Sequence, residues 1–167
     1  MTRELLDVVD LQGKKTGIAC RACVHEKRLL HQSAFIILLD EQGRVFIQKR
    51  SFSKDLYAGQ YAVSASGHVD AGESVLHAAK RELREELGLS GVRLVKIATV
   101  PAFTRFERTL CTYFKARLPE NARFKLDRNE LIANESKFLS WKQARKLGRR
   151  TAPSLRLAIE LYDMELV

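Results

Sequence analysis

The sequence is poor in cysteine, proline and tryptophan, and it has no long apolar run. It contains three cysteines, three prolines and one tryptophan in 167 residues. So few cysteines, in odd number, exclude a disulfide-stapled secreted scaffold, and no segment approaches the roughly 18 apolar residues that span a bilayer. The first ten residues mix charges with aliphatic side chains and lack a signal-peptide core. We therefore expect a cytoplasmic protein with no membrane segment.

The composition that is present is that of a globular domain. Hydrophobic residues make up 46% and charged residues 29% of the chain, both ordinary values, and the length predicts one domain over residues 1–167. The formal charge of +9 favours anionic partners, which are phosphorylated small molecules or nucleic acid. Nucleic acid is left open but not favoured, because the basic cluster at Arg145, Lys146, Arg149 and Arg150 has no interleaved aromatic side chains.

Cys20 and Cys23 form a C-x-x-C motif with His25 two residues on. A structural zinc site usually needs a second such pair, and none follows. We expect ordinary thiols here, with metal or redox chemistry as the alternative.

Hydrophobic periodicity predicts strands and helices without a strict βαβ alternation, which favours an α/β fold with a mixed sheet and flanking helices. A near-continuous apolar run such as residues 34–40 is typical of a strand covered on both faces. The predicted strands are 5–9, 16–19, 34–40, 44–49, 61–65, 92–100, 108–116 and 137–141, and the predicted helices are 74–87, 140–147 and 153–166.

The helix predicted over residues 74–87 carries two faces. At 100° per residue, its apolar stripe comprises Leu76, Ala79, Leu83 and Leu87, and Gly88 is placed to end the helix.

On the neighbouring face, Glu82, Glu85 and Glu86 converge at spacings of three and four residues. Because three carboxylates repel one another, we expect a hard divalent cation among them, Mg²⁺ or Mn²⁺. Arg81 is placed to pair with Glu85. The alternative is a charged surface helix laced with ion pairs.

A longer pattern overrides that alternative. The chain resembles the Nudix hydrolase family, whose motif reads G-x5-E-x7-R-E-U-x-E-E-x-G-U, where U is a bulky aliphatic residue. A chance match in a chain of this length is on the order of one in ten million. Every specified position is filled, by Gly67, Glu73, Arg81, Glu82, Leu83, Glu85, Glu86, Gly88 and Leu89.

This resemblance implies an α/β/α sandwich with a mixed sheet, a metal-dependent hydrolase, a small-molecule diphosphate substrate and a homodimer. The metal ligands would be Glu82, Glu85, Glu86 and the Gly67 carbonyl, and the cation would lower the pKa of a bound water.

The resemblance also implies roles for other side chains. Glu85 and Glu86 are catalytic candidates, and Glu135 or Glu130, outside the motif, is a candidate for the base. Arg81 and Glu73 would support the site, and Lys49 and Arg50 would bind phosphate.

Three further segments, 24–35, 48–54 and 66–69, are similar to isopentenyl-diphosphate isomerase and to hydrolases close to it. That isomerase has a catalytic cysteine where this chain has Ser66 and a catalytic glutamate where it has Thr109, so the departures favour hydrolysis. Its extra metal site matches His25, His31, His68 and Glu107. Whether these four residues bind a metal is left open.

The sequence thus predicts a divalent-metal-dependent hydrolase that cleaves the diphosphate linkage of a nucleoside diphosphate-type small molecule. The alternatives are an isopentenyl-diphosphate isomerase-like enzyme and a non-catalytic nucleotide- or RNA-binding module. We expect specificity to reside in the loops at residues 52–60 and 103–108.

Overall fold

A computed structural model describes residues 4–164 and 167 of the chain. Their elements, in chain order, are β1 (Leu5–Val9), β2 (Lys15–Cys20), α1 (Arg21–Glu26), β3 (Leu30–Leu39), β4 (Val45–Lys49), β5 (Tyr61–Ala62), β6 (Ala65–His68), α2 (Val75–Leu87), β7 (Val95–Phe103), β8 (Arg108–Arg117), β9 (Lys137–Leu139), α3 (Trp141–Arg145), η1 (Gly148–Arg150) and α4 (Pro153–Asp163).

A mixed sheet of seven strands forms the centre, in the order β5-β4-β3-β8-β7, with β6 also on β3 and β9 also on β4. The central strand β3 runs parallel to β8 over ten residue pairs and antiparallel to β6. The contact between β3 and β4 is limited to Leu39 and Val45, so the two strands diverge after the turn that joins them. The divergence leaves room for the inserted strand β6 on the same side of β3.

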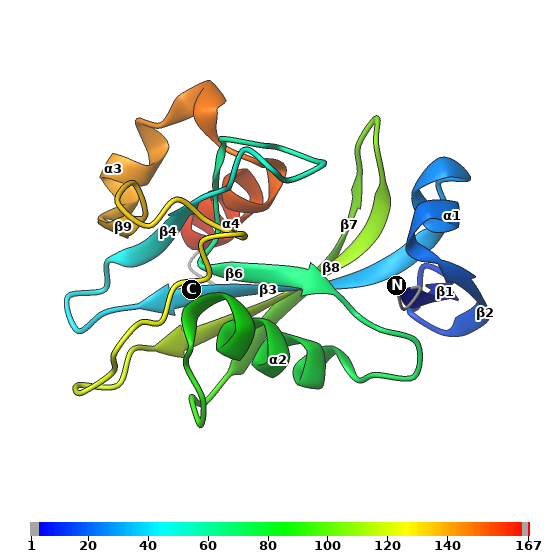
Figure 1. The fold of residues 1–167 in the computed structure, drawn as a ribbon, viewed down its shortest axis with the longest axis horizontal. Helices are drawn as coiled ribbons and strands as arrows, with labels where there is room; N and C mark the ends of the chain where they lie inside the picture. The colour runs from blue at the N-terminus through cyan, green and yellow to red at the C-terminus, as the bar shows by residue number, and fades with distance from the viewer. Residues whose placement is uncertain (1–3, 165–166) are drawn as a thin grey trace.

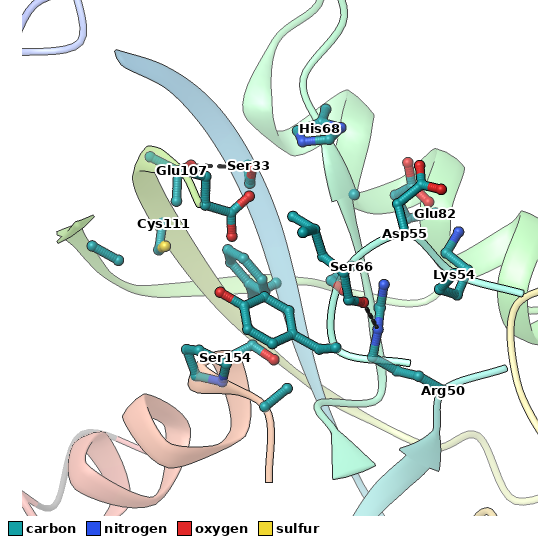
Figure 2. Close-up of a pocket in the computed structure, with 18 of the residues that line it drawn as sticks. Ser33, Arg50, Lys54, Asp55, Ser66, His68, Glu82, Glu107, Cys111 and Ser154 are labelled. Carbon is teal, nitrogen blue, oxygen red and sulfur yellow. Dashed lines mark hydrogen bonds between the residues drawn. The ribbon is translucent and has the colours of Figure 1, made fainter. Parts of the chain in front are cut away.

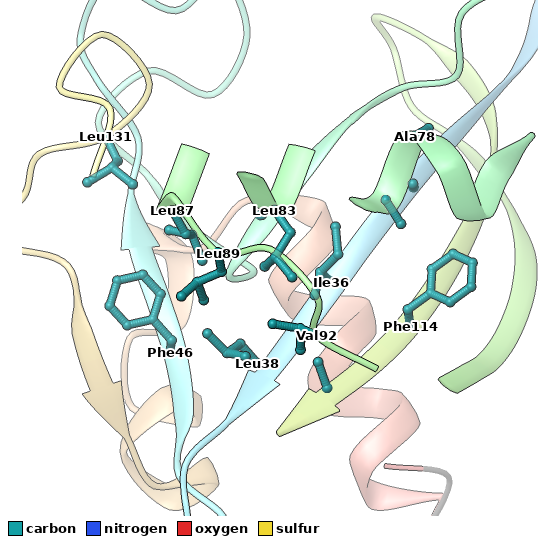
Figure 3. Packing of buried hydrophobic residues seen from close by; sticks show 14 of the residues in the cluster. Ile36, Leu38, Phe46, Ala78, Leu83, Leu87, Leu89, Val92, Phe114 and Leu131 are labelled. Atoms are coloured by element: carbon teal, nitrogen blue, oxygen red, sulfur yellow. The ribbon is translucent and has the colours of Figure 1, made fainter. Parts of the chain in front are cut away.

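Helices cover both faces of this sheet (Figure 1). β3 explains why, because its apolar residues alternate between two cores: Ile36 and Leu38 face α2, whereas Ile37 faces α3 and α4. Figure 3 shows Leu83 and Leu87 of α2 packed over Ile36 and Leu38. The architecture is therefore the α/β/α sandwich with a mixed sheet that the sequence predicted.

The β1–β2 hairpin and α1 gather at one end of the sheet (Figure 1). β1 also contacts the loop after β6: Leu6 bridges Asp70, and the Ala71 N–H donates to the Leu5 carbonyl at 2.8 Å. The hairpin thus holds the loop that leads into α2.

The structure corrects several expectations. The strand predicted at 61–65 is two strands, β5 and β6. The helix α1 was not predicted, because its six residues form fewer than two turns and give no periodic pattern. Leu76 is 42% exposed rather than buried, since helical periodicity gives the direction of a side chain but not how far the sheet extends beneath each turn. The end of the last predicted helix, residues 165–166, lies outside the described residues.

The expectation of ordinary thiols at Cys20 and Cys23 was wrong, because the two form a disulfide. The C-x-x-C spacing spans the first turn of α1 and brings the Cα atoms within 5.1 Å, which is inside the range that a disulfide bridges. Within the part of the chain described here, no helix is both long and apolar enough to cross a membrane.

The packing of α2 predicts unequal costs for two leucine substitutions. Leu83 is 2% exposed and Leu76 is 42% exposed, so Leu83→Ala should lower the free energy of unfolding by about 2–5 kcal/mol, and Leu76→Ala by less than about 0.5 kcal/mol. Urea denaturation followed by circular dichroism measures both. Equal losses would show that α2 packs differently.

Candidate active site

Local signals place α2 at the edge of the candidate site. Ser74 caps its N-terminus by accepting a hydrogen bond from the His77 N–H at 3.2 Å, and Gly88 ends it in the left-handed region at φ 71°. Between the caps, the helix buries Ala79, Leu83 and Leu87 against the sheet. Its three glutamates, Glu82, Glu85 and Glu86, line a pocket.

Arg81 organises these acidic side chains. Its guanidinium donates to both Glu73 carboxylate oxygens, at 3.2 and 2.9 Å, and to the His68 carbonyl at 2.9 Å. It also forms an ion pair with Glu82, and its Nη1 lies 3.5 Å from Glu85. Although burial alone would raise the pKa of Glu73, these hydrogen bonds from Arg81 lower it. Arg81 therefore connects the loop before α2, the helix itself and β6.

Glu86 is the most buried carboxylate of the group, with 2% exposure. Its Oε2 accepts hydrogen bonds from the Gln48 Nε2 at 3.1 Å and from the Ser66 N–H at 3.3 Å. Burial raises its pKa well above the usual range, and the nearby Glu82 and Glu130 raise it further. Among the described residues no cationic group pairs with it, so a buried acidic position lacks a neutralising charge.

Gly67 lies directly against Glu82. A Cβ added at Gly67 would be 2.0 Å from the Glu82 Oε1, so any larger residue would displace that carboxylate. This close approach explains why glycine begins the motif: it lets the backbone of β6 and the glutamates of α2 share one space.

These groups line a pocket of about 380 Å³. Figure 2 shows Glu82, Asp55 and Lys54 on one side of it and Glu107 and Cys111 on the other. The pocket therefore runs from the acidic motif toward the middle of β3 and β8. Its inner wall is mostly apolar or hydroxylated and includes Ser33, Phe35, Ala102, Thr109, Tyr113, Ser154 and Leu157.

Of the four residues that the sequence analysis proposed for the site outside the motif, two line the pocket and two do not. Arg50 and Glu130 line it, as does Lys54, whose Nζ lies 2.6 Å from a Glu130 oxygen. Lys49 and Glu135 are not among the lining residues, and they pair with each other at 3.6 Å. The geometry thus favours Arg50 for phosphate contact and Glu130 over Glu135 as the acidic residue near the motif.

A second cluster lies at the far side of β6. His25, His31, His68 and Glu107 come from four separate segments, yet their ligand atoms all lie within 4.8 Å of one another. The His25 and His68 Nε2 atoms are 3.3 Å apart. These donors have the mixed imidazole and carboxylate character of a transition-metal site.

In His31 and His68, the Nδ1 atom forms a hydrogen bond to a group outside the cluster. The His31 Nδ1 lies 3.1 Å from the Leu29 carbonyl, and the His68 Nδ1 lies 3.1 Å from a Glu4 carboxylate oxygen. Both contacts fix a tautomer in which Nε2 is free to accept, as in metal-binding histidines. The His31 Nε2 is buried without a partner in the described structure, and burial lowers the pKa of His31 to about 4.

Sequence reasoning did not identify Gln48 or Glu4 as members of these clusters. A sequence signal for Gln48 was present, because it is a polar residue that follows the apolar residues Val45, Phe46 and Ile47 in one strand. Glu4 had none, because its partner His68 is 64 residues away.

Comparisons with known proteins agree with this geometry. The family model described as NUDIX domain matches residues 29–158. A Nudix hydrolase of Pseudomonas aeruginosa, PA4841, is 32% identical over 95% of this chain and 93% of its own length. This chain belongs to the NUDIX domain family, whose members generally hydrolyse pyrophosphate bonds.

Two further similarities refine the picture. A Serratia proteamaculans protein named isopentenyl-diphosphate Delta-isomerase is 40% identical over 60% of this chain and 54% of its own length. The crystal structure of DR0079 from Deinococcus radiodurans superposes with a TM-score of 0.79, covering 94% of this chain and 98% of that one at 23% identity, which shows the fold. The chain spans about half the length of several curated relatives that it matches.

The buried charge of Glu86 predicts a stability that depends on pH. In metal-free protein its raised pKa means that stability is present at low pH and is lost as pH rises from about 4.5 through the raised value. Glu86→Gln keeps an acceptor for Gln48 and removes the charge. At pH 8 in EDTA this variant should therefore be more stable by about 1–2 kcal/mol, a rise of roughly 2–6 °C in Tm, with a smaller gain at pH 5. Scanning calorimetry at both pH values measures this, and an unchanged or lower Tm at pH 8 would contradict the electrostatic argument.

Proposed function

We propose that this protein is a divalent-cation-dependent pyrophosphohydrolase that cleaves the diphosphate linkage of a nucleoside diphosphate-type small molecule. The observation that carries the proposal is the buried Glu86 beside Glu82, with which no cationic side chain of the described residues pairs and whose pKa is raised by burial and by neighbouring carboxylates. Clustered acidic oxygens of this kind suit Mg²⁺ or Mn²⁺ held jointly by protein and substrate phosphates.

The donor set fits such a cation. Glu82, Glu85 and Glu86 supply carboxylate oxygens, and the backbone of Gly67 lies against Glu82. The cation, when bound, lowers the pKa of water and balances the charge of the diphosphate. Glu73 acts through Arg81, which it holds by two hydrogen bonds.

Other side chains of the pocket are candidates to bind the substrate phosphate and to accept the proton of the attacking water. Arg50 lies where its guanidinium can bind a phosphate oxygen. Glu130 is our candidate to accept the proton of the attacking water, with Lys54 at 2.6 Å holding its carboxylate. Glu135 remains the alternative, and a substrate-induced shift of its segment would be needed to bring it into the pocket.

The remainder of the pocket fits the organic part of the substrate. The inner wall offers the stacked pair Phe35 and Tyr113. Tyr57 also lines the pocket, and its ring meets that of Phe106 edge to face. Aromatic walls with a few hydroxyl groups suit a planar base or a similar apolar group.

We also propose that His25, His31, His68 and Glu107 bind a second divalent cation. The buried and unpartnered His31 Nε2 supports this, because an orphaned polar atom of this kind is costly unless a ligand satisfies it. Imidazole ligands favour Zn²⁺ over Mg²⁺.

Isomerisation of an allylic diphosphate is the second candidate function, favoured by the isomerase relative and by this histidine cluster. Two pocket residues weigh against it. Ser66 has no acidic proton at neutral pH, and the Thr109 hydroxyl donates to Ser33 at 3.1 Å.

Activity should require both the cation and Glu86. Phosphate-containing products from nucleoside diphosphates, dinucleoside polyphosphates and ADP-ribose should appear with Mg²⁺ or Mn²⁺ and disappear in EDTA. Glu86→Gln should lower kcat by about 10³-fold, equivalent to about 4 kcal/mol, whereas Glu120→Gln, the same change at an exposed loop, should leave it unaltered. Wild-type rates in Glu86→Gln would refute the assignment, and a shifted double bond in isopentenyl diphosphate would favour the isomerase.

The second cation site makes a separate prediction about stoichiometry. Purified protein equilibrated with Zn²⁺ should retain a metal ion that His68→Gln fails to retain and that Glu86→Gln still retains, as measured by elemental analysis. Retention of the same amount by His68→Gln would exclude the histidine cluster as a site.

A further inference from the structure

Gln48 lies in β4, which precedes the motif in the sequence, and its side chain is 1% exposed. Its Nε2 donates to the Glu86 Oε2 at 3.1 Å, and the Ser66 N–H donates to the same oxygen at 3.3 Å. We propose that Gln48 is a positioning residue that holds Glu86 for cation binding by a neutral hydrogen bond. This inference rests on the proposed function.

The shared acceptor oxygen is the first argument. Two protein donors, from β4 and β6, hold the Oε2 oxygen of Glu86 in place. Its Oε1 makes no hydrogen bond to any residue that the structure describes, so this oxygen is the one left for a ligand. Outer hydrogen bonds that orient a metal-binding carboxylate in this way are a recurrent feature of protein metal sites.

The neutrality of both donors is the second argument. Glu82 and Glu130 line the same pocket as Glu86, and no cationic side chain among the described residues forms an ion pair with Glu86. A lysine or arginine at position 48 would neutralise the carboxylate directly and compete with the cation. An amide satisfies the oxygen and leaves the negative charge in place.

The third argument concerns the carbonyl oxygen of the Gln48 side chain. The Gln48 Oε1 is buried and has no partner in the described structure, although buried acceptors are ordinarily satisfied. A side chain chosen for packing alone would be apolar here, as Ile47 and Phe46 are. Among the described residues, the side-chain amide of Gln48 forms a single hydrogen bond, to Glu86.

Three variants separate this role from packing. Gln48→Met keeps the side-chain length and removes the amide, and Gln48→Asn keeps the amide but withdraws it by one methylene. Both should weaken Mg²⁺ binding by about 10- to 100-fold. Gln48→Lys should restore a hydrogen bond, raise the Tm of the metal-free protein and still lose Mg²⁺ binding. The control is Thr112→Val, which removes from β8 a buried hydroxyl that is hydrogen-bonded to Thr99 of β7 and should leave Mg²⁺ affinity unchanged.

Isothermal titration with Mg²⁺ measures the affinity, and Mg²⁺ is used because the imidazole cluster is a poor site for it. The Mg²⁺ concentration for half-maximal turnover should rise in parallel, with a smaller change in kcat at saturating Mg²⁺. Wild-type affinity in Gln48→Met, or in Gln48→Asn if the first variant does not fold, would overturn the inference, as would normal Mg²⁺ binding by Gln48→Lys. Failure of the wild-type protein itself to bind Mg²⁺ would instead overturn the proposed function.

Discussion

The site is organised around one unfavourable feature, the buried carboxylate of Glu86, with which no cationic side chain of the described residues pairs. Its side chain is 2% exposed, and Glu82 and Glu130 act on it as like charges that Arg50 opposes only in part. Such a group destabilises a bare fold. Under the proposed function, a divalent cation and a diphosphate entering the pocket together would offset this cost.

The fold meets this requirement by bringing three elements to one place. α2 supplies the acidic side chains, β6 approaches so closely that only glycine fits at position 67, and β4 supplies the neutral donor Gln48. The divergence of β3 and β4 after their turn admits β6 between them. The two hydrophobic cores, one on each face of β3, hold β4 and β6 in place beside the site.

The two candidate cation clusters are neighbours because β6 carries members of both. Gly67 faces Glu82, and the next residue, His68, belongs to the histidine cluster. Arg81 donates to the His68 carbonyl while pairing with the motif glutamates, so a shift at one cluster acts on the backbone of the other. The pocket extends between them, which is consistent with a substrate whose charged and organic parts lie at different ends.

Much of this protein is determined by its sequence alone, since the motif residues, the apolar runs and the helix caps act locally along the chain. Ser74, Gly88 and the glutamates of α2 could be placed because helix geometry relates residues three and four positions apart. The burial of Glu86, its bond to Gln48 and the engagement of His68 by Glu4 could not, because each joins segments 38 to 64 residues apart. Only the packing of the strands decides such contacts, because they join segments that are far apart in the sequence.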